Sequence, residues 1–405
     1  MRIAVIGTGV AGSLLLDCLR GAPGLTVQGF ERVPAGSRDE AGTGLNLCPN
    51  ALKALRLHHP ARHADLREAS LPWRRWFTGL ADGTPLMDLD LLDLAEEPGS
   101  RLRWSELYRL LREPVTGLTL HDHALEAVEE DAEGRLVPVF RTPAGLARHG
   151  GFDLLVAGDG RYSRLRALTA GEPRPEFHRI GMLRLLIPDA EDCPYEDYGQ
   201  WFQGSNRLLS YRLPGGAAYI AGGFTLGEDG EITPALRAAE AQRGIYAPPG
   251  AEACAAVEWM VGKLERHIED VHWARLQVAP LQRSAAGGRV LFLGDAAHAM
   301  VPTLGQGATQ AIEDGVLAAA VLRAGDGVAE IGALRDPRIA FIRALSVEAT
   351  DTMLPGADPV AGTLKKLRPE FLTKLRRAYT EVPGPEAVTS PPSARSASPA
   401  AGRAS

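Results

Sequence analysis

Residues 7–12 read Gly-Thr-Gly-Val-Ala-Gly, and this turn decides the fold prediction. A buried strand is predicted before it, over 2–6, and a helix after it, over 11–20. In such a strand, turn and helix, the glycines let the backbone approach a pyrophosphate at the helix N-terminus. A second strand, 26–31, ends at Glu31, whose carboxylate can accept hydrogen bonds from ribose hydroxyls. Because these features occur together, we predict a dinucleotide-binding βαβ unit.

Two further segments each follow a predicted buried strand. Residues 158–166 read Gly-Asp-Gly-Arg-Tyr-Ser-Arg-Leu-Arg. Residues 294–307 read Gly-Asp-Ala-Ala-His-Ala-Met-Val-Pro-Thr-Leu-Gly-Gln-Gly, and a helix with one apolar face is expected from Gln306. Alone, the Asp-Gly pair at 159–160 is most often only a turn. The longer series at 294–307 is much harder to obtain by chance.

In this order and at these distances, the three segments resemble the single-component FAD-dependent aromatic hydroxylases of the para-hydroxybenzoate hydroxylase type. The resemblance covers residues 1–350 in outline. It implies an α/β (α+β) protein with a Rossmann-like FAD-binding domain that starts with the βαβ unit, a second mixed-sheet substrate domain, and C-terminal helices. It also implies that NADH or NADPH reduces FAD, and that O2 then forms an FAD C4a-hydroperoxide. This species would hydroxylate an electron-rich ring such as a phenol, hydroxybenzoate or hydroxypyridine.

Domain boundaries are predicted from where the expected elements change character. We expect 1–72, 98–178 and 280–350 to form a discontinuous FAD-binding domain, and 73–97 and 179–279 to form the substrate domain. A C-terminal helical segment is expected over 351–382. Residues 383–405 are dominated by Ala, Ser and Pro, which bury too little apolar surface to offset chain entropy, so we expect a disordered tail.

The resemblance also assigns a cofactor site. Asp295 would bind a ribityl hydroxyl, Pro302 would lie beside the isoalloxazine ring, and Asp159 would lie near the flavin and the nicotinamide route. Gly305 and Gly307 would expose a positive helix N-terminus to reduced flavin. The predicted cofactor-binding residues are Gly7, Gly9, Val10, Ala11, Gly12, Glu31, Arg32, Arg38, Arg103, Asp159, Asp295, Pro302, Gly305, Gln306, Gly307 and Ala308.

One position departs from the family pattern. Many relatives begin the helix after the first substrate-domain hairpin with an arginine that reaches the flavin, in an Arg-x-x-Leu pattern. Trp104 takes that place here. Arg101, Arg103 or Arg38 is expected to substitute, and the sequence leaves the choice open.

Histidine titrates near neutrality, which makes His298 a tempting catalytic base. Its place in the flavin-loop signature favours a packing role instead. The acidic residues Glu313 and Asp314 are interpreted in the same way, as a buttress for that loop.

Substrate-binding residues are expected on the predicted strand 207–213. Ser210 and Arg212 share a face by the two-residue alternation, and an arginine there can pair with a substrate carboxylate. The alternative is that Arg212 is a solvated edge-strand charge. Weaker candidates are Tyr195, Tyr198 and Arg184.

Composition excludes several other classes of protein. A net charge of −6 argues against nucleic acid as a partner, and no apolar run approaches the length of a bilayer helix. The apolar strand at the very start leaves no room for a secretion signal. The four cysteines show neither disulfide nor metal-ligand spacing, so no metal is expected. We therefore expect a cytoplasmic protein, a monomer or homodimer, whose partners are a small aromatic substrate and O2.

Two other functions stay open. A same-scaffold oxygenase or epoxidase would act on a larger natural product. A non-oxygenating FAD-binding NAD(P)H oxidase or sensor would bind FAD without substrate-stimulated reduction. The intact segments at 158–166 and 294–307 favour an active oxygenase.

Overall fold

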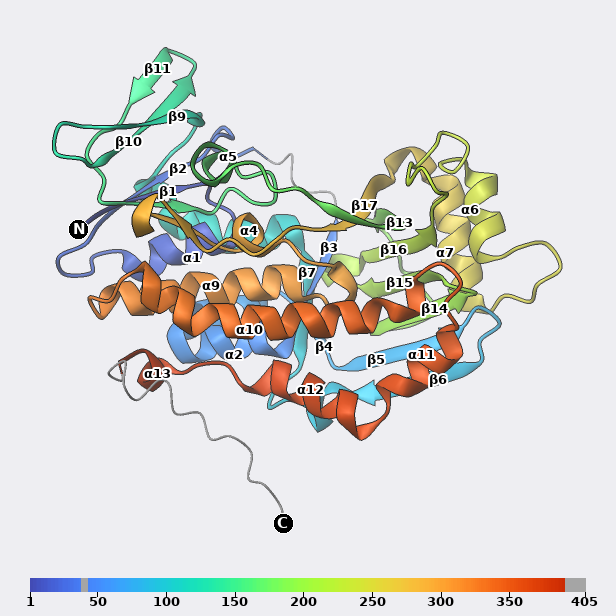
Figure 1. Cartoon of the computed structure of the whole chain (residues 1–405). Coiled ribbons are helices and arrows are strands. Elements are labelled where there is room, and N and C mark those ends of the chain that lie inside the picture. Colours follow the sequence, from blue (N-terminus) through green and yellow to red (C-terminus); the bar gives the residue numbers. More distant parts are fainter. Residues whose placement is uncertain (38–42, 390–405) are drawn as a thin grey trace.

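A largely parallel sheet forms around the N-terminal glycine turn in the computed structural model, which describes residues 1–37 and 43–389 (Figure 1). The strand order is β18-β19-β12-β1-β2-β8. The central strands β1 and β12 are almost entirely buried, which explains why their sequences are apolar without alternation. The bounds are β1 (Arg2–Ile6), β2 (Thr26–Phe30), β8 (Thr119–Leu120), β12 (Leu154–Ala157), β18 (Ser284–Ala285) and β19 (Val290–Phe292).

The glycine turn packs directly against the loop that follows β12. Gly7 has a positive φ of 87°, and a Cβ there would lie 2.5 Å from the Cα of Asp159. A Cβ on Gly12 would lie 2.2 Å from the Gly7 carbonyl oxygen. Side chains at either position would therefore push the first and second motifs apart.

A second, mixed sheet has the strand order β17-β13-β16-β15-β14-β5-β6. Its pairs are antiparallel except β14 with β5. Both faces are covered: Leu208 and Ile220 pack in one core cluster with residues of α7, while Leu209 and Tyr211 face the C-terminal helices. The bounds are β5 (Arg75–Leu80), β6 (Pro85–Asp90), β13 (Glu176–Ile187), β14 (Tyr198–Gln203), β15 (Asn206–Arg212), β16 (Ala218–Thr225), β17 (His272–Val278), α6 (Ala239–Tyr246) and α7 (Ala255–Arg266).

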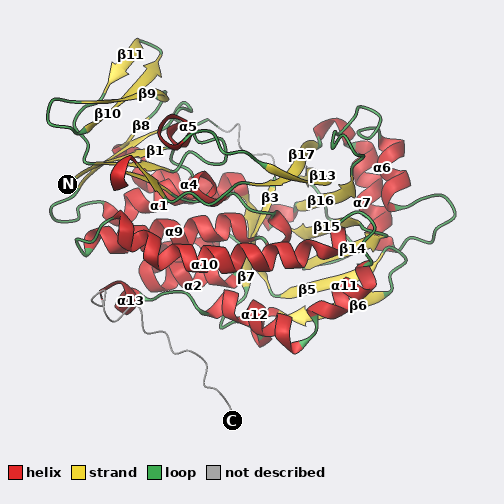
Figure 2. Ribbon diagram, in the orientation of Figure 1, coloured by secondary structure: helices red, strands yellow, loops and turns green. Residues whose placement is uncertain are grey.

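Two smaller sheets complete the strand arrangement, and Figure 2 shows the helices and strands together. The order β3-β7-β4 makes a three-stranded sheet, and β11-β10-β9 makes a second one that projects beside the parallel sheet. The bounds are β3 (Gly44–Leu47), β4 (Leu71–Trp73), β7 (Gly99–Arg103), β9 (Ala124–Glu130), β10 (Leu136–Thr142), β11 (Gly145–Arg148), α2 (Pro49–His58), α3 (Pro60–Glu68), α4 (Trp104–Arg112) and α5 (Arg164–Ala170).

The chain ends in helices. In Figure 1, the long helices α9 and α10 run side by side from the parallel sheet toward the mixed sheet. The bounds are α8 (Asp295–His298), α9 (Gln306–Arg323), α10 (Val328–Ala349), α11 (Pro359–Lys366), α12 (Pro369–Thr380) and α13 (Pro385–Thr389). Short 3-10 helices are η1 (Leu91–Asp93), η2 (Glu113–Leu118), η3 (Pro214–Gly216), η4 (Ile268–Asp270), η5 (Ala286–Gly288), η6 (Pro302–Leu304) and η7 (Thr350–Met353).

This architecture confirms the predicted fold class, while the domain boundaries stay a prediction. Strands of the parallel sheet lie within 2–30, 119–157 and 284–292, and those of the mixed sheet within 75–90 and 176–278. The expectation of a disordered tail from residue 383 is wrong at its start. Val388 of α13 is buried in the core around α1 and α9, and this contact supplies the apolar surface that the composition seemed to lack. Residues 390–405 lie outside the described residues.

Within residues 1–37 and 43–389, no helix combines the length and apolar composition that crossing a membrane requires.

Candidate active site

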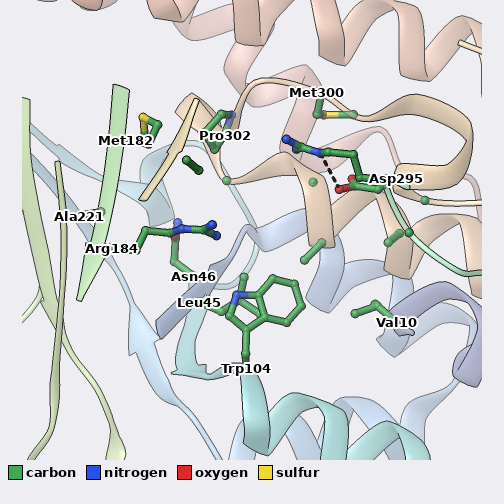
Figure 3. A pocket seen from close by; sticks show the side chains of 18 of the residues that line it. Val10, Leu45, Asn46, Trp104, Met182, Arg184, Ala221, Asp295, Met300 and Pro302 are labelled. Atoms are coloured by element: carbon green, nitrogen blue, oxygen red, sulfur yellow. Dashed lines mark ion pairs between the residues drawn. The ribbon is translucent and has the colours of Figure 1, made fainter. Parts of the chain in front are cut away.

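The three motifs meet at a cavity of about 360 Å³ between the parallel and mixed sheets (Figure 3). The N-terminal turn contributes Gly9, Val10 and Ala11, and the third motif contributes Asp295 and Pro302. The opposite wall comes from β13, β15, β16 and β17 of the mixed sheet. The cavity therefore lies where predicted cofactor residues and the second sheet face each other.

Glycines shape the part of this cavity that would hold a cofactor. A Cβ on Gly9 would lie 2.9 Å from the Gly158 carbonyl oxygen, and one on Gly305 would lie 2.9 Å from Nδ2 of Asn46. Gly305 also has a positive φ of 65°. Both glycines are N-cap residues, of α1 and α9, and neither helix has a side-chain cap. Two helix N-termini thus open onto one cavity, which suits a pyrophosphate at α1 and an electron-rich ring system at α9.

Two carboxylates stand where a dinucleotide's sugar hydroxyls would need them. Asp295 lines the cavity at the start of α8, and its only ionic partner among the described residues is Arg161, 3.8 Å away. Glu31 ends β2 beside the glycine turn, where its Oε2 accepts hydrogen bonds from the backbone N (2.9 Å) and Oγ1 (3.0 Å) of Thr8. Both retain free lone pairs for hydroxyl donors. The residues present therefore fit FAD.

The predicted cofactor residues do not all reach this cavity. Those that line it are Gly9, Val10, Ala11, Asp295, Pro302, Gly305, Gly307 and Ala308. Those that do not are Gly7, Gly12, Glu31, Arg32, Arg103, Asp159 and Gln306, while Arg38 lies outside the described residues.

Physical reasons account for several of these absences. The Asp159 carboxylate is buried, which raises its pKa, and it accepts a hydrogen bond from Leu165 N at 3.2 Å. It faces α5, so its expected place beside the flavin is not seen, although its neighbours Gly158 and Gly160 line the cavity. The Gln306 side chain instead donates to Asn50 (3.3 Å).

Four arginines of the described chain line the cavity, and among them the sequence indicated only Arg184 as a substrate-binding candidate, and a weaker one. Arg161 and Arg275 have carboxylate partners, Asp295 and Glu231. Arg184 on β13 and Arg207 on β15 have none within ion-pair distance among the described residues, and the Nε atom of each is buried without a hydrogen-bond partner there. Figure 3 shows Arg184 extending from the mixed sheet into the cavity.

The sequence left open which arginine substitutes for the family arginine at the position of Trp104. The Trp104 side chain itself lines the cavity. Arg101 is not the substitute, because its guanidinium donates to the carbonyl oxygens of Pro72 (2.8 Å) and Glu196 (2.6 Å). Arg103 does not line the cavity either. We propose Arg184 as the cation that serves in its place.

The expectation for Ser210 and Arg212 needs correction. On β15, Arg207, Leu209 and Tyr211 line the cavity, so Ser210 and Arg212 belong to the other face. Arg212 donates to backbone carbonyls, including that of Cys193 at 3.0 Å. The alternation was correct, but β15 lies inside the sheet with both faces covered, so alternation could not indicate which face lines a site.

Arg207 is the more informative of the two arginines without a carboxylate partner. It is 3% exposed, and its one side-chain hydrogen bond to the described residues, from Nη1 to Oε1 of Gln200, is long at 3.4 Å. Burial lowers its pKa, but an arginine stays protonated. A buried cation without a carboxylate is costly, which points to a ligand that supplies the negative charge.

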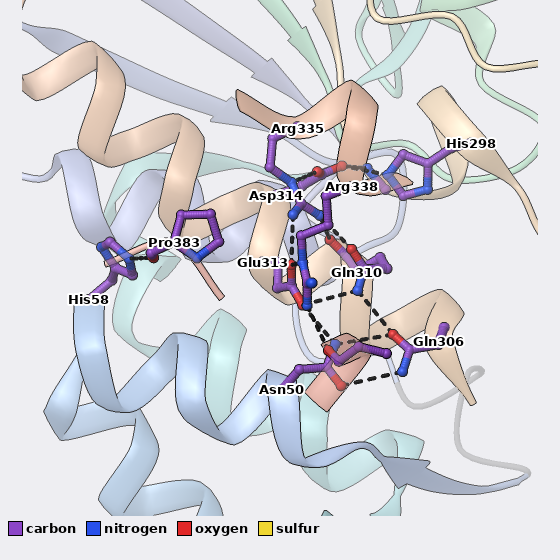
Figure 4. A network of polar contacts seen from close by, with 12 residues as sticks. Asn50, His58, His298, Gln306, Gln310, Glu313, Asp314, Arg335, Arg338 and Pro383 are labelled. Carbon is purple, nitrogen blue, oxygen red and sulfur yellow. Dashed lines mark hydrogen bonds and ion pairs between the residues drawn. The ribbon is translucent and has the colours of Figure 1, made fainter. Parts of the chain in front are cut away.

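A buried polar network on α9 and α10 contacts the flavin loop, residues 294–307, and we call this network the brace (Figure 4). Asp314 of α9 accepts a hydrogen bond from Gly294 N (2.8 Å), and its Oδ2 lies 2.6 Å from Nε2 of His298. From α10, Arg335 donates to Asp314 (2.8 Å) and to Glu313 (2.6 Å). His298 is fully buried and absent from the cavity wall, so the packing role predicted for it agrees with its position. Arg335 carried no recognisable motif in the sequence.

Among the described residues, no group of three or more His, Cys, Asp or Glu side chains could hold a metal ion. Fold and cavity together define a flavin-binding Rossmann-type protein with a second sheet over the site. Residues 263–327 match the family model described as an FAD binding domain.

Comparison with known proteins then gives the family. The chain is 30% identical over 370 residues to 3-amino-4-hydroxybenzoate 2-monooxygenase PtmB3 of Streptomyces platensis, which covers 86% of this chain and 87% of that relative. It is 27% identical over 345 residues to 6-hydroxynicotinate 3-monooxygenase of Pseudomonas fluorescens, covering 80% and 82%. The fold matches that of Klebsiella pneumoniae HpxO complexed with FAD and uric acid, with a TM-score of 0.73, 22% identity and 93% coverage of both chains. The chain belongs to the single-component FAD-dependent aromatic hydroxylases, and it is an FAD-dependent NAD(P)H monooxygenase.

The carboxylates of Glu31 and Asp295 are predicted to help retain the cofactor. Asp295→Ala and Glu31→Ala should each weaken FAD binding roughly tenfold, because each removes an acceptor for a cofactor hydroxyl. The flavin-to-protein absorbance ratio after purification, followed by FAD titration of the apoprotein, measures this. Glu129→Ala, at an exposed acid paired with Arg148, is the control. Unchanged FAD affinity in both variants would reject the proposed roles.

Proposed function

We propose that this monooxygenase hydroxylates a small aromatic ring that carries a carboxylate together with an electron-donating hydroxyl or amino group. The observation that carries the proposal is the cavity-lining, buried guanidinium of Arg207 without a carboxylate partner in the described chain. A bidentate arginine–carboxylate pair is among the strongest hydrogen-bonded contacts in proteins, and it fixes orientation as well as binding.

Bound FAD supplies the redox chemistry, since it takes a hydride from NAD(P)H and, once reduced, uses O2 to hydroxylate the ring. The residues of this chain position the substrate ring. Ala221 of β16 is the cross-strand neighbour of both Arg184 and Leu209, and its small side chain leaves space for a flat ring between the longer ones. Anchored at one end by Arg207, the ring would extend from the mixed-sheet wall into the larger cavity, toward the residues predicted to hold FAD.

Apolar and aromatic side chains line the ring's expected position. Leu209, Tyr211 and Tyr219 lie on the mixed-sheet wall, and burial raises the pKa values of both tyrosines. Their phenols therefore stay neutral at physiological pH. Such a wall limits the water that reaches the reacting edge, which protects the oxygen transfer from loss as H2O2.

The relatives support a carboxylate-bearing ring. By their names, the enzymes from Streptomyces platensis and Pseudomonas fluorescens act on 3-amino-4-hydroxybenzoate and 6-hydroxynicotinate, and each of these compounds is an aromatic carboxylate. Both rings also carry an electron-donating group. This pattern matches the chemistry that Arg207 would recognise.

The test uses the purified holoenzyme with a panel of hydroxybenzoates, aminohydroxybenzoates and hydroxynicotinates. NADH and NADPH oxidation, H2O2 release and incorporation of oxygen from ¹⁸O2 are measured for each ring. We expect an aromatic carboxylate to stimulate cofactor oxidation, with little H2O2 and one labelled oxygen in the product. If only rings without a carboxylate, or larger natural products, are hydroxylated, the proposal is wrong.

We also propose a cytoplasmic location and a monomeric or homodimeric state. The four cysteines are free in the structure, which supports a reducing compartment. Light scattering on the purified holoenzyme determines the assembly state.

A further inference from the structure

A second, smaller cavity of about 40 Å³ adjoins the larger one at Arg207. Both cavities share a boundary, which is formed by Asn46, Arg207, Leu209, Pro302 and Gly305. We call the smaller cavity the inner chamber. The rest of its wall comes from Trp73, Trp76, Tyr198, Thr303, Leu304 and Tyr379.

At about 40 Å³, the inner chamber has roughly a ninth of the volume of the larger cavity, and this size suits a small polar substituent such as a carboxylate better than a ring. The ring itself would have to remain in the larger cavity, on the other side of Leu209 and Arg207.

Two tryptophans of the chamber wall differ in their hydrogen bonding. The Nε1 atom of Trp73 donates to the Arg75 carbonyl oxygen at 3.0 Å. The Nε1 atom of Trp76, which is only 4% exposed as a residue, is buried without a partner among the described residues. Buried N–H groups are rarely left unpaired in folded proteins, so this donor is available to a ligand atom or an ordered water.

The remaining polar group of the wall comes from the C-terminal part of the chain. Burial raises the pKa of Tyr379 of α12 well above its usual range, so its hydroxyl remains a donor. The helix is held in place by the brace of the flavin loop, because Arg338 of α10 donates to the carbonyl oxygen of Ala378 (2.9 Å) and to Glu313 (2.8 Å). Residues that carry donor groups thus line the chamber from β5, β15 and α12.

We propose that the inner chamber is the carboxylate-binding subsite of the enzyme, in which Trp76, Arg207 and the hydroxyl of Tyr379 donate to the two carboxylate oxygens. This inference rests on the proposed function, namely that the substrate is an aromatic carboxylate. It makes Trp76 and Tyr379 specificity-determining residues. A carboxamide would turn its NH2 group toward Arg207 and Trp76, which cannot accept a hydrogen bond, and a ring without the substituent would leave the donors unpaired.

The experiment measures affinity for the holoenzyme by the change in flavin absorbance. The probes are 3-amino-4-hydroxybenzoate, its carboxamide, and 2-aminophenol, which is the same ring without the carboxylate. We expect the wild type to prefer the carboxylate over the carboxamide. Trp76→Phe and Tyr379→Phe should each reduce that preference about tenfold, while affinity for 2-aminophenol changes little. Trp259→Phe, at a tryptophan of α7 that lines neither cavity, is the control.

The outcomes separate the two proposals. If the wild type shows no preference for the carboxylate, the proposed function fails and the subsite fails with it. If the wild type shows the preference and Arg207→Met abolishes it, but Trp76→Phe and Tyr379→Phe both retain it in full, the proposed function stands and the inner chamber is not the subsite. FAD content and thermal unfolding of each variant establish that it is folded.

Discussion

Arg207→Met is expected to weaken binding of an aromatic carboxylate about 100-fold, or about 2.7 kcal/mol, while making the ligand-free protein more stable. The affinity loss follows because the methionine leaves the ligand's carboxylate in a buried site without its cation, a loss that typically costs 2–5 kcal/mol. The stability gain follows because wild-type Arg207 is desolvated with only one long hydrogen bond, to Gln200. Replacing a buried, poorly paired cation with an apolar side chain should stabilise the fold by about 1–2 kcal/mol.

Substrate titration of the holoenzyme and thermal unfolding of the ligand-free protein measure the two effects. Arg212→Met is the matched control, because this arginine is on the same strand but donates to backbone carbonyls away from the cavity. It should leave affinity for the carboxylate unchanged. If Arg207→Met retained wild-type affinity for every aromatic carboxylate that the enzyme binds, Arg207 would not be the anchor.

Arg335→Met should lower the free energy of unfolding by about 3–5 kcal/mol, because it removes a fully buried guanidinium from Glu313 and Asp314. Arg338 and Arg283 still pair with these acids, so partial compensation favours the lower half of that range. Urea unfolding of the holoprotein at neutral pH measures the loss. Arg289→Met removes an exposed pair with Glu130 and should cost less than about 1 kcal/mol. A similarly small loss in the free energy of unfolding for Arg335→Met would contradict the role of this network in stabilising the fold.

The same network predicts how stability changes with pH. Burial acts to raise the pKa of Glu313, but Arg338 and Arg335 outweigh it and lower that pKa to about 2. A carboxyl with a lowered folded pKa stabilises the fold above its unfolded pKa, about 4.3 for glutamate. That contribution is lost as the pH falls from about 5 toward 2. Arg335→Met should make this acid-side loss shallower, which urea unfolding between pH 7 and pH 3 would show.

The fold and the cofactor were predictable because short-range rules control them. Gly7 and Gly12 sit in a turn that tolerates no side chain, and their spacing, together with the flanking strand and helix and with Glu31, indicated the βαβ unit. Asp295, Pro302 and Gly305 lie within one short segment of the chain, so their relative positions depend mainly on local structure. The resemblance therefore predicted residues that line one wall of the cavity, while their contacts with FAD stay a prediction.

The opposite wall depends on contacts between residues far apart in the chain. Alternation placed Ser210 and Arg212 on one face of β15, but the packing of α7 on that face decided that Arg207 faces the site instead. Arg335 pairs with two acids that lie more than 20 residues earlier in the chain. Tyr379 lines the inner chamber together with residues as distant in the sequence as Asn46. No local pattern encodes such contacts.

By itself, then, the sequence determined the flavin-binding fold and the cofactor, since each rests on spacing within a strand, turn or helix. Only the tertiary structure decided which arginines remain without a carboxylate in the cavity, and which aromatic residues enclose the inner chamber. The reason is physical: whether a charge is neutralised depends on which side chains the packed sheets and helices bring within a few ångströms, and that is a property of the assembled core.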